Sequence, residues 1–236
     1  MAEISYVFHL PDGHSQTITL RFADDTFLLQ LAEDGQPEDW TALAFKQCPH
    51  CPLSPDTTPR CPLARALSGF VHGFDAFYSY EVAMVEVVTA QRTMSTSHPL
   101  QESMASILGL VGAASGCPHL DFFRPMARFH LPFATEQETL LRVFSIHLLR
   151  EYLRSGGQGD QRIGLGGLPA HFDAVAKVNL AMAERIRAAF KKDVVVNAIV
   201  ILDTFAQAVP WVIEDALSEL MPLFDLRVTD GPEPAP

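Results

Sequence analysis

Each of the four cysteines in this 236-residue chain is followed directly by a proline, and this repeated step constrains the fold more than any other feature. The steps begin at Cys48, Cys51, Cys61 and Cys117. Proline fixes its own φ, lacks an amide hydrogen and biases the preceding residue towards an extended backbone. The four thiols are therefore expected on rigid, non-helical backbone.

The spacing of the cysteines predicts a metal centre. Cys48 and Cys51 form a C-x2-C pair, which can reach one ion from a single turn and is the usual first half of a tetrahedral zinc site. Cys61 and Cys117 would complete a four-cysteine ligand set, and His119 is a further candidate ligand. Zinc is therefore the first cofactor that the pattern predicts.

Other states of the same thiols stay open at this stage. Four cysteines with a Cys-Pro step are also typical of iron–sulfur clusters, which would make the site a redox centre. The thiols could instead form disulfides or pack as inert apolar side chains, because a single C-x2-C pair also arises by chance. If Cys117 lies too far from Cys51, His119 or His50 is the next candidate for the fourth zinc ligand.

The hydrophobic pattern predicts an α+β fold, with a small antiparallel β-sheet front packed on an α-helical C-terminal half. Two β-rich stretches flank Asp12-Gly13, which is a strong hairpin signal. Helical spacing begins at Pro62 and dominates after about residue 98. The expected strands cover residues 4–10, 15–22, 26–31, 41–45 and 80–89.

Capping and breaking residues place the later helices. Thr135 and Glu138 form a capping box in front of an apolar run, so a helix is expected from there to about residues 155–157. The next amphipathic stripe runs over 172–189.

Two further signals concern the last helices. Asp193 is placed to cap a helix over 194–208, and Pro210 is expected to start a separate helix at Trp211. The chain then divides into a β-rich region 1–92, which contains the Cys/Pro-rich segment 46–62, an α-helical region 93–225 and a disordered tail 226–236.

Charge and hydropathy restrict the partners. Seventeen Lys and Arg residues against 28 Asp and Glu give a net charge of −11, which disfavours nucleic acid and anionic membranes. The N-terminus lacks the pattern of a signal peptide. Asn197 and Asp203 interrupt the longest apolar stretch, 194–202, so no membrane span is expected and the protein is predicted to be cytoplasmic.

Arg124 and Arg128 are candidates for binding a small anion. They stand one helical turn apart if Pro125 is the first helical residue, and they follow Cys117 closely. The alternative is that both arginines pair with the surplus carboxylates of this acidic chain.

No established catalytic motif is present, so the sequence leaves open whether the protein is an enzyme. The glycine-rich stretch 156–167 follows a helix instead of a strand, which favours a linker over a phosphate-binding loop.

Three segments together resemble an uncharacterised bacterial family, a domain of unknown function, over most of the chain. They are Cys48-Pro-His-Cys51-Pro-Leu, Cys61-Pro, and Ser115-Gly-Cys-Pro-His through Arg124-Pro-Met-Ala-Arg-Phe-His-Leu-Pro-Phe133. The resemblance implies a bacterial, intracellular protein with a cysteine site, and it implies no substrate.

Two hypotheses follow for the function. The first is a zinc-binding structural or regulatory protein, in which the metal joins the β-rich front to the helices and the helices offer a surface to a protein partner or a second copy. The second is an iron–sulfur or thiol-dependent redox protein or enzyme that acts on a small anion held by Arg124 and Arg128.

Overall fold

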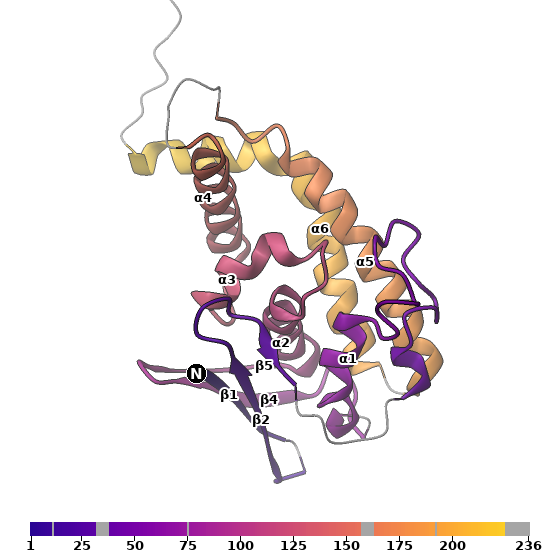
Figure 1. Ribbon diagram of the computed structural model, residues 1–236. Coiled ribbons are helices and arrows are strands. Elements are labelled where there is room, and N and C mark those ends of the chain that lie inside the picture. Colours follow the sequence, from indigo (N-terminus) through magenta and orange to yellow (C-terminus); the bar gives the residue numbers. More distant parts are fainter. Residues whose placement is uncertain (11, 32–37, 75, 157–162, 192, 225–236) are drawn as a thin grey trace, which may run out of the picture.

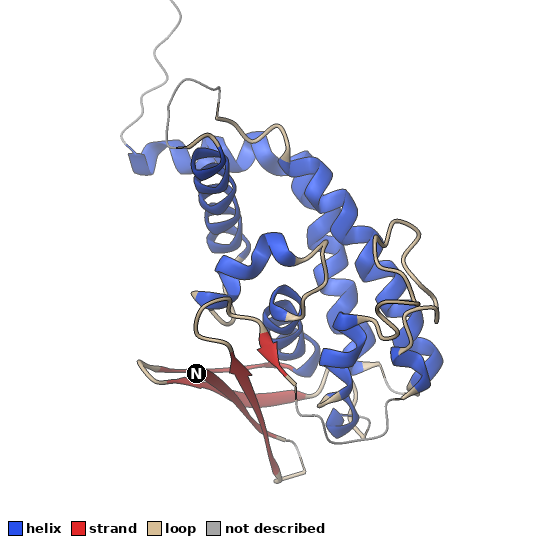
Figure 2. Ribbon diagram, viewed as in Figure 1, coloured by secondary structure: helices blue, strands red, loops and turns tan. Residues whose placement is uncertain are grey.

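The computed structural model describes residues 1–10, 12–31, 38–74, 76–156, 163–191 and 193–224. A five-stranded sheet lies on one side of a group of helices (Figure 2). The predicted α+β fold is therefore confirmed. The predicted tail 226–236 and part of the predicted linker fall outside the described residues.

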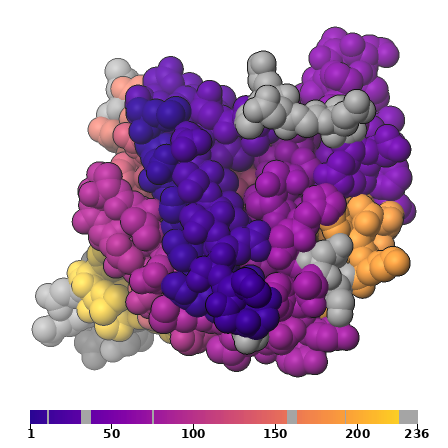
Figure 3. All heavy atoms as spheres, turned by 90° about the horizontal axis from the view of Figure 1, so that it is seen from below, coloured from indigo at the N-terminus to yellow at the C-terminus, as the bar shows by residue number. Residues whose placement is uncertain are grey.

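The sheet is antiparallel throughout, in the order β3-β2-β1-β4-β5. The predicted hairpin is confirmed, since β1 and β2 pair from Ala2↔Phe22 to His9↔Ser15. Figure 3 shows both strands, in indigo, running across the face seen from below. The strands are β1 (Ala2–His9), β2 (Ser15–Phe22), β3 (Leu29–Gln30), β4 (Val82–Thr89) and β5 (Thr93–Pro99).

One face of the sheet packs against the helices because apolar residues alternate along three strands. Every second residue of β1, β2 and β4 is buried, whereas most of the residues between them are partly or fully exposed. The buried set is Ile4, Tyr6, Phe8, Ile18, Leu20, Phe22, Ala83, Val85 and Val87.

The sheet edges differ from the prediction. The expected strand 26–31 is reduced to the two residues of β3, and the expected strand 41–45 is replaced by a 3-10 helix (η1, Asp39–Thr41) and an isolated bridge between Ala42 and Arg60. Strand β5 was not predicted. Its residues are mostly small and polar and none is fully buried, so it lacks the alternating apolar signal.

The helices form layers above the sheet (Figure 1). Helix α2 contacts β4, β5 and α6, and α5 packs along α6. The helices are α1 (Pro62–Ser68), α2 (Leu100–Ala114), α3 (Arg124–Arg128), α4 (Glu136–Arg154), α5 (Leu168–Ala189) and α6 (Val194–Leu220), with short 3-10 helices η2 (Val71–Phe74), η3 (Asp121–Phe123) and η4 (Met221–Phe224).

Helix α4 begins at the predicted capping box. The Thr135 hydroxyl accepts a hydrogen bond from the Glu138 amide at 3.2 Å, and the Glu138 carboxylate accepts one from the Thr135 amide at 2.7 Å. These bonds satisfy amides that the first helical turn leaves without partners.

Replacing this capping threonine gives a simple stability test. Thr135→Ala is expected to reduce the free energy of unfolding by about 1 kcal/mol, because an amide at the helix start loses its acceptor. The urea midpoint should fall accordingly, while Thr204→Ala, at an exposed mid-helix position of α6, should not lower it. Equal midpoints for Thr135→Ala and the wild type would contradict the capping role.

Helix α6 runs through Pro210, so the predicted break at that residue is wrong. Proline removes one amide donor, which bends a long helix without ending it when neighbouring packing persists. Figure 1 shows the bend, after which the helix crosses over towards α4. The Asp193 carboxylate does not cap the helix amides, because it accepts hydrogen bonds from the Ser79 amide at 3.1 Å and hydroxyl at 3.0 Å.

The uninterrupted helix α6 is relevant to the prediction that the chain has no membrane span. Residues 194–224 form one helical stretch that is long and apolar enough to cross a membrane, judged by length and composition. Asn197 and Asp203 both lie within this helix, as the predicted helix over 194–208 requires. Within this structure α6 packs along α2 and α5, and 28% of its most apolar window is buried.

Candidate functional site

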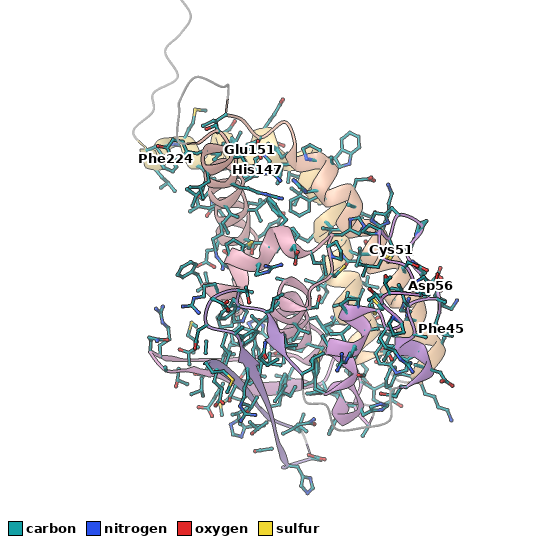
Figure 4. The ribbon with its side chains drawn as sticks, in the orientation of Figure 1. Phe45, Cys51, Asp56, His147, Glu151 and Phe224 are labelled. Atoms are coloured by element: carbon teal, nitrogen blue, oxygen red, sulfur yellow. The ribbon has the colours of Figure 1, made fainter. Side chains whose placement is uncertain are left out.

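The Cys/Pro-rich segment is a loop whose two ends are tied together. Leu43 donates its amide hydrogen to the Pro59 carbonyl at 2.9 Å, and Cys61 donates to the Thr41 carbonyl at 2.8 Å. Because the ends meet, the loop is fixed as a compact unit without regular secondary structure. Figure 4 shows Cys51 on this loop beside α5.

Within the loop, the C-x2-C pair forms a tight turn. The Cys51 amide donates to the Cys48 carbonyl at 3.0 Å, which holds the two cysteines on one side of the turn. The His50 ring between them bonds through Nε2 to the Ala174 carbonyl of α5 at 3.0 Å. The turn is thus anchored to a helix more than a hundred residues downstream.

Two identical Cys-Pro-His tripeptides meet at this point, one at residues 48–50 and the other at 117–119. The rings of His50 and His119 stack with centroids 4.0 Å apart. His119 also bonds through Nε2 to the His50 carbonyl at 3.0 Å. The segment after α2 is therefore brought directly against the loop.

The four thiols lie close enough to influence one another. All four are free, with Cys61 and Cys117 buried and Cys48 and Cys51 half-buried. Burial raises the pKa of the Cys48 thiol to about 11, and the charges of Cys61 and Cys51 add to the rise. The sulfurs thus share one region, and at neutral pH Cys48 is a neutral thiol.

Cys117 belongs to the same group. Burial raises its pKa to about 12, while hydrogen bonds from the backbone amides of His119 and Leu120 act in the opposite direction, and the charges of Cys61 and Cys48 add to the rise. Amide donors aimed at a sulfur stabilise its thiolate. Burial therefore raises the pKa of this thiol, whereas the hydrogen bonds lower it.

The ligand geometry is less complete than the electrostatic grouping. Among the described residues, no group of three His, Cys, Asp or Glu side chains has an arrangement that could hold a metal ion. His119 and His50 each use one ring nitrogen on a backbone carbonyl, and the other nitrogen of His50, Nδ1, is buried without a partner.

Arg185 is a member of this site that the sequence reading missed. Only 1% of it is exposed, and its guanidinium donates to the carbonyls of Trp40, Ala42 and Leu43 at 2.7–2.9 Å. Within the described residues no carboxylate pairs with it. A signal for it was present, because Arg185 lies three residues after Met182 on the apolar stripe of α5.

Arg185 lies near enough to the thiols for their ionisation to affect its pKa. Burial lowers the pKa of its guanidinium, and the negative charges of Cys61, Cys48 and Cys51 act to raise it. Its Nε is buried without a hydrogen-bond acceptor. The site therefore combines four thiols with a buried cation.

The two arginines predicted to clamp an anion make different contacts. Arg124 pairs with the carboxylate of Asp121, as expected under the alternative to anion binding. Arg128 is exposed and its guanidinium lies over the Phe27 ring, 5.2 Å from the centroid. No carboxylate within the described residues pairs with Arg128.

Comparison with known proteins gives one family. A family model described as a domain of unknown function (DUF6901) matches residues 4–225. No curated protein and no solved structure matches the chain.

Proposed function

The chain belongs to the family described as a domain of unknown function, DUF6901, and we propose that this member binds a metal through its cysteine thiolates in a structural or regulatory role. Zinc is the first candidate metal. The observation that carries the proposal is the buried Arg185 cation, which lies near the thiols and lacks a carboxylate partner among the described residues.

A buried guanidinium needs negative charge nearby, because removal from water is costly for an unpaired ion. The carbonyls of Trp40, Ala42 and Leu43 supply partial charges only. Neutral thiols add none, whereas a zinc ion with four thiolate ligands carries an overall negative charge. Metal binding would thus provide Arg185 with its counter-charge.

The raised pKa values argue against a reactive thiol. A nucleophilic cysteine depends on a lowered pKa, and Cys48 and Cys117 show the opposite shift. A bound metal displaces the thiol protons and makes the sulfurs thiolates even in a buried site. The amides directed at the Cys117 sulfur would then stabilise the bound state.

An iron–sulfur cluster is the second candidate, because four cysteine thiolates can also hold several iron atoms in place of a single ion. A cluster of several iron atoms spaces its four cysteines further apart, and it equally leaves negative charge on the site. Such a centre would give the protein a redox role.

The position of the site suggests its structural role. A metal held by Cys48, Cys51, Cys61 and Cys117 would tie the closed loop to the start of α1 and to the segment after α2. Binding that requires the folded arrangement adds its free energy to folding. Four free thiols also suit a reducing compartment, which supports a cytoplasmic location.

Metal analysis of protein purified without oxygen tests the proposal. We expect bound zinc in a colourless sample, or iron and sulfide with broad visible absorption for the cluster. Cys51→Ser should lower metal content and reduce the melting temperature by about 5 °C or more, since a lost ligand weakens metal-linked stability. Ser54→Ala, in the same loop, should change neither. The proposal would be refuted if wild-type protein from cells grown with zinc or iron contained no metal and if Cys51→Ser left the melting temperature unchanged.

A further inference from the structure

A large apolar cavity lies among α2, α3, α4, α5 and α6, and none of the four cysteines lines it. Its volume is about 590 Å³. Packed protein interiors contain few voids larger than a water molecule, whereas small-molecule pockets measure roughly 300–1,000 Å³. The apolar wall includes Leu108, Met126, Phe172, Met182, Leu202 and Phe205.

Small residues on α2 leave this space open. Ala105, Gly109, Gly112 and Ala113 recur at helical spacing along the cavity wall. A Cβ added at Gly109 would contact only Leu202 Cδ2, at 4.0 Å. A larger side chain at this position would therefore enter the cavity instead of colliding with the backbone.

The cavity walls keep apolar surface accessible. Phe123, Met126, Phe133, Leu202 and Phe205 all line it, and each is only partly buried although it packs against the core. An apolar ligand would cover this surface and remove it from water, which is the main driving force for such binding.

One end of the cavity is polar and positively charged. His130, Leu131 and Arg142 line this cavity and also a second space of about 570 Å³. The walls of the second space include Arg92 and Arg128 as well. The apolar cavity and an arginine-rich pocket therefore meet at Arg142.

The arginines at this end have no carboxylate partners within 4.0 Å among the described residues. Arg142 is held in place by hydrogen bonds from Nη2 to the carbonyls of Met126 and Phe129, at 3.0 and 2.8 Å. Three such arginines around one pocket are unexpected in a chain with a net charge of −11. They are available to an anion from outside the chain.

Two of the carboxylates that line these walls are engaged elsewhere, while Glu136, which lines the apolar cavity, pairs with no described cation within 4.0 Å. Glu3 pairs with Arg21 at 3.1 Å, and Glu102 pairs with His98 at 3.0 Å. Glu138 lies close enough to Arg142 to affect the pKa of that guanidinium, but the Glu138 carboxylate accepts hydrogen bonds from Thr135. The positive charge at the junction is therefore not neutralised by direct ion pairs.

We propose that this double cavity binds a free long-chain fatty acid. The hydrocarbon chain would occupy the apolar cavity, and the carboxylate would bind at Arg142 in the field of Arg128 and Arg92. The buried Asn179 Nδ2 also lines the cavity and has no hydrogen-bond partner among the described residues.

Calorimetry with the delipidated full-length wild type tests the ligand class directly. Palmitate is expected to bind one molecule per chain, and each methylene removed from the ligand should weaken binding about fourfold. Hexadecanol, which has the same chain without the charge, should bind at least roughly tenfold more weakly, because the arginines lose a charge-assisted hydrogen bond. No palmitate binding, or equal affinity for octanoate and palmitate, would overturn the proposal. Equal affinity for hexadecanol would overturn the role of the arginines.

Two neighbouring arginines on α3 provide a matched pair of variants. Arg128→Gln should weaken palmitate binding several-fold and leave hexadecanol binding unchanged, whereas Arg124→Gln, whose residue lines neither space, should affect neither. Gly109→Leu should abolish binding of both ligands by filling the cavity. Full palmitate binding by a folded Gly109→Leu protein would place the ligand elsewhere, and the wild-type chain-length series decides the question if this variant fails to fold.

Discussion

Arg185→Met is expected to lower the free energy of unfolding by about 3–5 kcal/mol. The substitution keeps most of the apolar stem but leaves the carbonyls of Trp40, Ala42 and Leu43 without their donor in a buried site. Each unsatisfied buried polar group costs about 1–3 kcal/mol. Urea unfolding followed by circular dichroism would measure the loss.

Two control variants separate the charge from the geometry. Arg187→Met, at an exposed position two residues along α5, should change stability by less than about 0.5 kcal/mol. Arg185→Lys keeps the charge but cannot serve three carbonyls through a planar fork, so an intermediate loss is expected. If Arg185→Met and Arg187→Met had the same effect, the buried guanidinium would not be a structural element. If metal binding supplies its counter-charge, Arg185→Met should also reduce metal content.

The second large effect concerns acid stability and His130. Burial, followed by the positive charge of Arg142, lowers the pKa of His130 from 6.5 to about 3. The folded state thus favours the neutral ring, whose Nε2 hydrogen-bonds the Tyr6 hydroxyl at 2.5 Å. This contribution is complete above pH 6.5 and is lost as the pH falls towards 3, at a cost of about 2–4 kcal/mol for this partly exposed ring.

A non-titrating replacement isolates this contribution. His130→Gln can retain a hydrogen bond to Tyr6, so the variant should lose much less stability than the wild type between pH 6.5 and 3.5. His14→Gln removes only an exposed ion pair with Asp12, so it should change the wild-type pH dependence far less than His130→Gln does. Parallel unfolding curves for His130→Gln and the wild type over this range would rule out His130 as the source.

Local signals predicted the parts of the fold that depend on neighbouring residues. The Asp12-Gly13 turn and the Thr135 capping box each specify one local geometry, and both lie where they were expected. Strand β5 and the continuity of α6 through Pro210 depend on distant packing instead. A polar strand is ordered by pairing with β4, and a proline is tolerated when tertiary contacts hold the helix on both sides.

In the candidate site, too, local sequence features were recognised and features that depend on distant packing were not. The Cys-Pro pattern drew attention to residues 48–61 and 117, and these thiols influence one another's pKa in the structure. The helical spacing of α5 places Arg185 on the apolar stripe, but the sequence alone does not show that this arginine lies beside the cysteines. The double cavity also escaped prediction, since it results from the relative placement of five helices.

The central position of β1 has a consequence for folding during synthesis. Strand β1 is synthesised before β4, so its pairing with β4 must wait until residues 82–89 have been made. Until then one edge of β1 offers unpaired amides and carbonyls to any other extended chain. The sheet is therefore completed only after β4 has been synthesised, and the separation of the two strands in sequence is expected to slow their pairing.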